Sequence, residues 1–287
     1  MRHDHLFIGG QWVESESGEV YTRRDPATGN VVSRHDRATR AEAERAITAA
    51  REAFDHGPWP HMGAAARGDV LRRAAAELRE RTDELARLIT LETGKPIAQA
   101  RGEIQTTANL FDHFTHLALE AHGESYAISG TYDALVAREP VGVVAAIVPW
   151  NFPLLMGAWK IAPALAAGNT LVIKSSSTTP LSLFELGKLL NQVLPAGVVN
   201  IVSGRGARTG QAMLDHPGFD KLAFTGSTEV GYSVAEAAAK RLIPSTLELG
   251  GKSPAVFLPS DDYSAAYPKI LSSIFFNAGQ TCTALSR

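Results

Sequence analysis

The sequence is poor in three features that often assign a protein to a class: cysteine, charge of one sign, and uninterrupted apolar runs. Its 287 residues include one cysteine, Cys282, so an intramolecular disulfide is excluded, which fits a reducing compartment. The 28 basic and 30 acidic side chains nearly cancel, leaving a net charge of −2. That balance offers no basic face to nucleic acid or to an anionic membrane. We therefore expect neither as a partner.

Export and membrane signals are also missing from the expected places. The first residues, MRHDHLFIGGQW, contain no apolar core as long as that of a secretory signal. The most apolar stretch, residues 141–168, is interrupted by three prolines and a lysine, which argues against a membrane span. Together with the single cysteine, these features predict a cytoplasmic location.

The first third of the chain has mainly helical periodicity. Thr39 and Glu42 have the spacing of a capping box, and apolar residues then recur with helical spacing to Phe54. Residues 67–96 predict one or two further helices, which end at a glycine and a proline. A third periodic run covers about Ile97–Leu119. This portion is therefore expected to be helical.

From residue 123 the pattern changes to strands. Alternating residues on both sides of Gly130 predict a two-stranded hairpin over 123–139. Short β-branched runs then alternate with helix-length segments: VGVVAAIVP, NTLVIKS, GVVNIVSG, DKLAFTGS, STLELGG and PAVFLP. Continuous apolar strands separated by helices predict an α/β fold with a doubly wound parallel sheet buried on both faces. Ligands of such sheets bind at the carboxyl ends of the strands.

Two glycine-rich turns and one lysine are candidates for binding a phosphate. In FTGSTEVG, a predicted strand passes through Gly226 into Ser227 and a helix, and backbone amides at a helix start suit a pyrophosphate. The plain alternative is an ordinary strand-to-helix turn capped by Ser227. The turn SGRGARTG contains Gly204, Gly206 and Gly210, a spacing one residue off the dinucleotide fingerprint. Lys174 ends a predicted strand, where it either meets a ribose or phosphate or lies solvated in a loop.

Three polar residues are candidates for catalysis. Asn151 lies between Trp150 and Phe152, and its amide either serves an oxyanion or closes a local Asx-turn. Glu248 ends a predicted strand before a glycine pair, where it is either a general base or the partner of a cation. Cys282, in a turn expected to enter a helix, is either a nucleophile activated by its surroundings or an inert buried thiol.

Taken together and in this order, the motifs resemble one family. The runs PWNFP, FTGSTEVG, LELGGKSP and FFNAGQTC are similar to the signature runs of the NAD(P)-dependent aldehyde dehydrogenases. The similarity extends from the FIGGQWV segment to the cysteine, and Glu248 and Cys282 lie 34 residues apart, as in the family. The resemblance implies a Rossmann-like cofactor domain with a helical N-terminal portion, an inserted β-hairpin and the start of a second α/β domain.

The resemblance also implies a role for each matching residue. Cys282 would attack the aldehyde carbonyl, and Asn151 with the backbone amide of Cys282 would hold the oxyanion. After hydride transfer to NAD or NADP, Glu248 would activate the water that releases the carboxylic acid. The positions that match cofactor contacts are Ile147, Trp150, Lys174, Gly204, Gly226, Ser227, Val230, Leu249 and Gly250. Phe152, Met156 and Trp159 match the walls of an apolar aldehyde tunnel, which favours aliphatic or aromatic aldehydes, and no metal is implied.

One departure from the family pattern concerns the cofactor. Family members that favour NAD often carry a glutamate where this chain has Ser177, at the position that binds the adenosine ribose. A carboxylate there repels a 2′-phosphate, whereas a serine does not. The sequence therefore predicts use of NADP as well as NAD, or a preference for NADP.

A second departure is that family chains continue far past the cysteine. We accordingly expect the sequence to lack most of the catalytic domain and the late strand that joins the hairpin in a homo-oligomer. The expected division is a cofactor domain over 1–122 and 140–249, an oligomerisation hairpin over 123–139, and the first segment of an incomplete catalytic domain over 250–287. Apolar runs in that last segment predict an exposed surface.

Three alternatives to an active dehydrogenase follow. The chain is a nucleotide-binding remnant without turnover, or its thiol transfers acyl groups without a redox step, or it is a fragment that associates through an unpaired hairpin or sheet edge.

Overall fold

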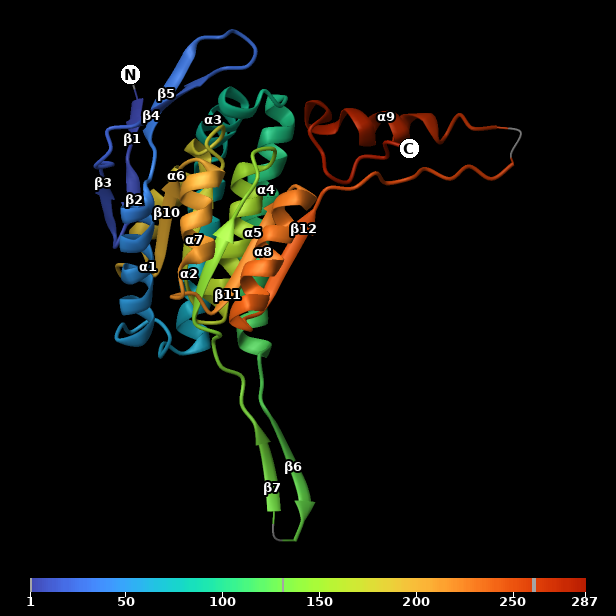
Figure 1. Ribbon diagram of the computed structural model, residues 1–287. Helices are drawn as coiled ribbons and strands as arrows, with labels where there is room; N and C mark the ends of the chain where they lie inside the picture. Colours follow the sequence, from blue (N-terminus) through green and yellow to red (C-terminus); the bar gives the residue numbers. More distant parts are fainter. Residues whose placement is uncertain (1, 131, 260–261) are drawn as a thin grey trace.

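The computed structural model describes residues 2–130, 132–259 and 262–287. A layered α/β body carries two projections, a long hairpin and a C-terminal arm, which leave it in different directions (Figure 1). The strands are β1 (Arg2–Asp4), β2 (Leu6–Ile8), β3 (Gln11–Val13), β4 (Val20–Arg24), β5 (Val31–Asp36), β6 (Glu124–Ser129), β7 (Tyr132–Val136), β8 (Val143–Ile147), β9 (Thr170–Ser175), β10 (Val199–Ser203), β11 (Lys221–Gly226) and β12 (Ser245–Leu249). The α-helices are α1 (Arg40–Asp55), α2 (Ala64–Glu80), α3 (Thr82–Thr93), α4 (Ile97–Glu120), α5 (Pro153–Ala166), α6 (Leu181–Asn191), α7 (Gln211–Asp215), α8 (Thr228–Arg241) and α9 (Tyr267–Phe275).

The main sheet confirms the predicted doubly wound α/β class. Within the described residues it has seven strands in the order β12-β11-β8-β9-β10-β2-β3, and the five from β8 to β12 run parallel. Counted along the chain, those five lie in the spatial order 3-2-1-4-5, so the winding reverses between β8 and β11. In sheets of this kind the crevice outside that reversal binds ligands.

Alternating side chains of the central strands supply two hydrophobic cores. Ala146 and Ile173 belong to the core cluster that contains side chains of α4, α5 and α6. Their neighbours Ala145 and Val172 belong to the cluster that contains side chains of α1, α7 and α8. Helices therefore cover both faces of the sheet, as the continuous apolar strands predicted.

The N-terminal part is built from local signals that the sequence displays. Ile8 pairs with Gln11 across a two-residue turn, in which Gly9 and Gly10 have φ of 61° and 80°. Glycine suits this turn because both central residues need a positive φ. The predicted capping box of Thr39 and Glu42 is present at the start of α1.

The helical predictions are confirmed, with one ambiguity resolved. Residues 67–96 contribute to two helices, α2 and α3, which meet at Arg81. Helix α3 ends at Gly94, whose φ of 78° is left-handed, as is common at helix ends. Helix α4 follows from Ile97 to Glu120.

Two expectations for the C-terminal side of the sheet were wrong. The run PAVFLP is not a strand: residues 254–259 form no regular element, and Val256 is 82% exposed. The amide of Ala255 donates to the carbonyl of Arg287, but no strand of the described chain pairs with the segment, so no ladder extends along it. Strand β12 forms, but it is exposed or half-buried along its length because, among the residues described, it lies at the sheet edge with only β11 beside it.

Both projections expose apolar side chains. The hairpin β6–β7 pairs only with itself in the described chain, and Leu135 on it is 80% exposed. On the C-terminal arm α9 buries none of its residues, and Phe275 is 68% exposed. The exposed surface expected for residues 250–287 is therefore present. Among the residues described, no helix combines the length and apolar character needed to span a bilayer.

Candidate active site

The parallel strands align four of the predicted cofactor residues along one edge of the sheet. Ile147 pairs with Lys174, and Gly226 pairs with Leu249. Ile147 also pairs with Phe224, which joins the two sides across the reversal between β8 and β11. The carboxyl ends of these strands therefore form one continuous rim.

Lys174 lies buried in this rim, so the alternative of a solvated loop lysine is wrong. Its Nζ donates to the carbonyl of Ser175 at 3.1 Å, and burial lowers its pKa from the ordinary lysine value to about 8. Next to it, Ser177 Oγ donates to the carbonyl of Gly204 at 2.7 Å. A side chain at Gly204 would collide with Thr209 Oγ1, 2.0 Å from the position of a Cβ. The rim thus brings an ammonium and a hydroxyl beside a closely packed glycine turn.

On the other side of the reversal, β11 passes through Gly226 into α8. Ser227 is the N-cap of α8, and its Oγ accepts a long bond from the amide of Val230 at 3.4 Å. The capped turn and the anion site are compatible here, because the first amides of a helix have no acceptor within it. Ser227, Val230 and Gly250 are exposed, so a ligand reaches all three.

Asn151 follows β8 and is held by residues distant in the sequence. Its Nδ2 donates to the carbonyl of Gln280 at 2.9 Å, so the local Asx-turn alternative is wrong. The backbone carbonyl of Asn151 accepts from Lys95 Nζ at 2.9 Å and from Asn277 Nδ2 at 2.8 Å. The preceding Trp150 is half exposed, and its carbonyl accepts from Thr179 Oγ1 at 3.0 Å. The turn after β8 is therefore joined directly to the loop that leads to Cys282.

That loop has an unusual backbone. Asn277, Ala278 and Gly279 have φ of 54°, 55° and 79°, a left-handed run in which two of the three residues are not glycine. Such residues persist where surrounding contacts impose the conformation. Here the amide of Asn277 donates to Gln99 Oε1 at 2.6 Å, and Gln280 Nε2 donates to the carbonyl of Thr93 at 3.3 Å. The loop is therefore fixed to the α3–α4 region.

Cys282 lies exposed in a turn at the end of this loop, so the alternative of a buried thiol is wrong. The expected helix after it does not form in the described residues. Leu285 bridges to Ser253 instead, and the amide of Ser286 donates to the carbonyl of Ser253 at 3.1 Å. These pairings hold the backbone extended.

The three predicted tunnel residues lie at the start of α5. Phe152, Met156 and Trp159 have the spacing of one helix face; Met156 is buried, while Trp159 is partly exposed. Phe152 stacks on Phe276 with ring centroids 6.2 Å apart, and Lys95 Nζ lies 4.2 Å from the centroid of the Phe152 ring. An apolar wall thus adjoins the Cys282 loop.

Glu248 is exposed on the edge strand β12 and lies opposite Thr225 in the sheet. Because β12 lies at the edge of the sheet, this carboxylate is not enclosed among apolar side chains. Burial lowers the pKa of Lys160, and the negative charge of Glu248 opposes that shift. The two charges are close enough to interact, and Glu248 remains open to water.

Comparison with known proteins decides the family. A profile described as the aldehyde dehydrogenase family matches residues 12–287. The chain belongs to the aldehyde dehydrogenase family. It is 46% identical over 288 residues to aldehyde dehydrogenase family 2 member B4, mitochondrial, from Arabidopsis thaliana, covering 99% of this chain and 54% of that protein.

Two further relatives agree with this assignment. Putative aldehyde dehydrogenase DhaS from Bacillus subtilis is 42% identical over 284 residues, covering 98% of this chain and 57% of that protein. The NAD+ complex structure of aldehyde dehydrogenase from Bacillus cereus superposes with a TM-score of 0.96 at 38% identity, covering 100% of this chain and 59% of that one. The chain therefore spans a little over half the length of these dehydrogenases.

Sequence reasoning missed the residues that hold this candidate site together. They are Lys95, Gln99, Glu103, Asn277 and Gln280. Two of them stand in FFNAGQTC, where a polar residue in a glycine-containing turn is a weak signal for a side-chain contact. Lys95, Gln99 and Glu103 carry no such signal, because the residues of the site that they contact, Asn151, Leu155 and Asn277, lie 52 to 178 residues away.

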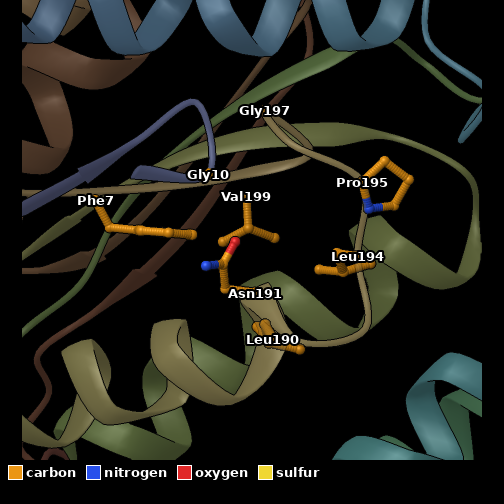
Figure 2. Close-up of a pocket in the computed structure, with 8 residues that line it drawn as sticks. All are labelled: Phe7, Gly10, Leu190, Asn191, Leu194, Pro195, Gly197 and Val199. Carbon is orange, nitrogen blue, oxygen red and sulfur yellow. The ribbon is translucent and has the colours of Figure 1, made fainter. Parts of the chain in front are cut away.

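The hollows of the body lie elsewhere. Figure 2 shows one beneath the β2–β3 turn, lined by Phe7, Gly10, Leu190, Asn191, Leu194, Pro195, Gly197 and Val199, and side chains fill it so closely that no water-sized space is left. A second, open hollow lies beside Gly9, Ala53 and Gly197. Neither is lined by a predicted site residue, so neither hollow competes with the rim of strand ends as the candidate site.

Proposed function

We propose that this chain carries the nucleophile and the cofactor crevice of an enzyme that oxidises an aldehyde to a carboxylic acid with NAD+ or NADP+. The observation that carries the proposal is the contact of the Asn151 amide with the Cys282 loop at the carboxyl end of β8. Family membership and the B. cereus relative, whose structure is an NAD+ complex, support it.

The chemistry begins at Cys282. Its thiolate sulfur bonds to the aldehyde carbon, and the carbonyl oxygen becomes an oxyanion held by the Asn151 amide and the backbone amide of Cys282. Asn151 Nδ2 must then leave the carbonyl of Gln280. Asn277 Nδ2 also donates to that carbonyl, at 3.0 Å, so it keeps a partner. Asn151 can therefore turn away from Gln280, while the hydrogen bond from Asn277 to Gln280 keeps the loop closed.

Collapse of the oxyanion re-forms the carbonyl, expels the hydride and leaves an acyl group on Cys282. NAD+ or NADP+, when bound, accepts that hydride. Glu248 then takes a proton from a water molecule, whose oxygen bonds to the acyl carbon and displaces the Cys282 sulfur. Because Glu248 is exposed, water reaches it freely.

The residues at the strand ends fit a dinucleotide. The buried Lys174 ammonium suits a ribose hydroxyl or phosphate, and the α8 start at Ser227 suits a pyrophosphate. Trp150 and Val230 expose apolar area on either side of the reversal, and Leu249 continues it along β12. Phe152, Met156 and Trp159 form the apolar wall of the substrate site, which favours aliphatic or aromatic aldehydes over charged ones.

The test is formation of reduced cofactor, followed by absorbance, from the 287-residue chain with a short aliphatic aldehyde and each of NAD+ and NADP+. Turnover that requires Cys282 supports the proposal. Nucleotide binding by the folded chain without turnover identifies a binding-only protein, and hydrolysis of an ester without cofactor identifies the acyl-transfer alternative.

Replacement of Asn151 by alanine is expected to lower kcat by ~10²–10³-fold, because one oxyanion donor is lost from a preorganised site. Dissociation constants for the two cofactors, measured in the same preparation, should change little. Asn151→Asp is the matched control: it keeps the shape but cannot donate, so its kcat should be at least as low. A kcat unchanged by either replacement would contradict the role of Asn151.

Replacement of Ser177 by glutamate is expected to weaken NADP+ binding about tenfold or more relative to NAD+, because the carboxylate repels the 2′-phosphate. Fluorescence titrations with both cofactors measure the ratio. Ser177→Gln introduces a side chain of nearly the same size as glutamate but without its charge. It should therefore leave the ratio of the NADP+ and NAD+ affinities near that of the parent. Equal shifts in both variants, or a large NAD+ preference in the parent, would count against dual use.

The division of the chain remains part of the proposal. We assign 1–122 and 140–249 to the cofactor unit, 123–139 to an oligomerisation hairpin and 250–287 to a segment of the catalytic domain. Exposed Ile128, Tyr132 and Leu135 on the hairpin support a homo-oligomer. The single cysteine favours a cytoplasmic location, whereas the Arabidopsis relative carries a mitochondrial name.

A further inference from the structure

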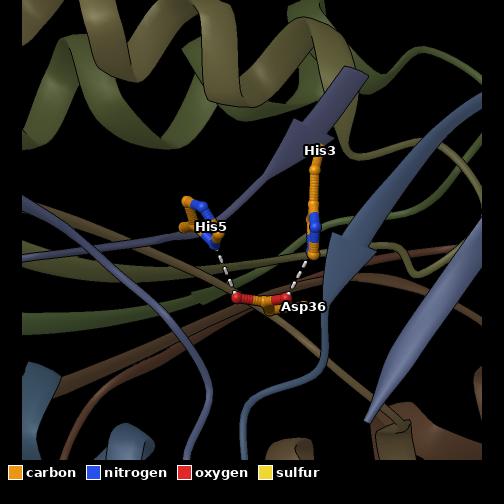
Figure 3. A group of neighbouring side chains, drawn as sticks. All are labelled: His3, His5 and Asp36. Atoms are coloured by element: carbon orange, nitrogen blue, oxygen red, sulfur yellow. Dashed lines mark hydrogen bonds and ion pairs between the residues drawn. The ribbon is translucent and has the colours of Figure 1, made fainter. Parts of the chain in front are cut away.

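A cluster of two imidazoles and one carboxylate joins the start of the chain to the end of β5. His3 lies in β1 and His5 follows that strand. Because one residue separates them in an extended segment, their side chains lie on the same face. Strand β1 runs parallel to β5, with Asp4 opposite His35, which brings Asp36 next to both histidines. Figure 3 shows His3 and His5 each directed at a different oxygen of Asp36.

The distances bring three potential ligand atoms together. His3 Nε2 lies 2.7 Å from Asp36 Oδ1, and His5 Nδ1 lies 2.9 Å from Asp36 Oδ2. All three ligand atoms lie within 4.8 Å of one another. Tetrahedral zinc with ligands at 2.0–2.1 Å requires separations of about 3.3 Å, which fall within this range. Small movements of the two rings would therefore admit an ion.

Burial of the cluster is uneven in a way that suits a binding site. The Asp36 side chain is only 6% exposed, and the amide of Ser15 donates to its Oδ2 at 3.1 Å, which fixes the carboxylate. The two imidazoles are 42% and 31% exposed, so an ion reaches them from solvent. A carboxylate fixed from behind, with two imidazoles open to water, is a preorganised ligand set.

We propose that His3, His5 and Asp36 bind one divalent transition-metal ion of the Zn²⁺ class. Two imidazoles and one carboxylate are a ligand set that Zn²⁺ accepts, with water completing the coordination, whereas Ca²⁺ and Mg²⁺ prefer oxygen ligands. The ion links residues 3 and 5 to residue 36 and so clamps the N-terminal segment to β5. It is independent of the dehydrogenase proposal, because no residue of that site takes part.

The experiment is a calorimetric Zn²⁺ titration of the untagged full chain after treatment with a chelator. Cys282→Ser serves as the background, because the thiol is itself a zinc ligand. His3→Gln and His5→Gln retain an amide that bonds to Asp36, and Asp36→Asn retains an acceptor for Ser15, so each conserves the local fold. His61→Ala removes an exposed histidine outside the cluster and is the matched control. Circular dichroism confirms that each variant is folded.

One Zn²⁺ per chain is expected, with affinity lowered at least about tenfold by each cluster variant and unchanged by His61→Ala. Zn²⁺ should also raise the melting temperature of the background protein but not that of His5→Gln, since ligands stabilise the state that binds them. Absence of saturable binding would overturn the proposal. Binding that survives Asp36→Asn would also overturn it, because the histidines alone would then hold the ion.

Discussion

Replacing Cys282 with serine is expected to stop formation of reduced cofactor, with a rate loss of ~10⁴-fold or more. The reaction needs a nucleophile that bonds to the aldehyde carbon and later leaves it. A thiol supplies a few per cent of thiolate near neutral pH, whereas a serine hydroxyl without an adjacent base supplies almost no alkoxide. The measurement is the absorbance of reduced cofactor with a short aliphatic aldehyde and saturating NAD+ or NADP+.

The control for this variant is cofactor affinity. Cys282 follows α9, whereas Lys174 lies in β9 and Ser227 caps α8, so the dissociation constants should be those of the parent. Turnover that persists in the Cys282→Ser protein would contradict the thioacyl mechanism. A parent that binds both cofactors, is folded and yields no reduced product would point to the binding-only alternative.

The sequence predicted the fold where local signals sufficed. The capping-box spacing of Thr39 and Glu42 predicted the start of α1, and the continuous apolar strands predicted a sheet covered on both faces. It failed where the outcome depends on neighbours. PAVFLP has strand propensity but no adjacent strand in the described chain, and β12 has apolar residues but lies at an edge.

In the candidate site, too, the sequence predicted what local motifs indicate and missed what depends on distant residues. The motifs marked Asn151 and Cys282 as functional candidates, yet nothing local indicated that the Asn151 amide contacts Gln280, 129 residues away. The sequence also contained no indication of the left-handed run that begins at Asn277, because neither asparagine nor alanine requires that conformation. Residues that position a site through long-range contacts leave little trace in a single sequence.

Replacing Lys95 with methionine is expected to lower the free energy of unfolding by about 3–5 kcal/mol, because it leaves the Glu103 carboxylate buried without its cation. Both side chains are 1% exposed, and Lys95 Nζ donates to Glu103 Oε2. Burial lowers the pKa of Lys95 and raises that of Glu103, while each charge opposes the other's shift. Methionine keeps most of the apolar stem, so the loss measures the charge rather than the packing. Urea unfolding followed by circular dichroism gives the value.

The pH dependence of this loss has a definite sign. Without Lys95, burial still raises the pKa of Glu103 above the ordinary glutamate value of 4.5, and only the backbone amides of Leu155 and Leu154, among the groups that lowered it, continue to oppose the shift. A carboxyl whose pKa is raised in the folded state stabilises the protein below that ordinary value, and the contribution is lost as pH rises through the folded pKa. The deficit of Lys95→Met relative to the parent should therefore be smaller at pH 5 than at pH 8. A variant as stable as the parent at both pH values would contradict the expectation.

The double variant Lys95→Met/Glu103→Gln separates charge burial from positioning. It carries no charge at position 95 or 103, and Gln Oε1 still accepts from the amide of Leu155, which donates to Glu103 Oε1 at 3.1 Å in the parent. Most of the lost stability should therefore return, and the pH dependence should disappear. The carbonyl of Asn151 still lacks the Lys95 donor and depends on Asn277 alone. If Lys95 positions the oxyanion donor, the double variant regains stability but not kcat. If both recover together, the ion pair serves the fold alone, and the turn at Asn151 is held well enough by the Cys282 loop.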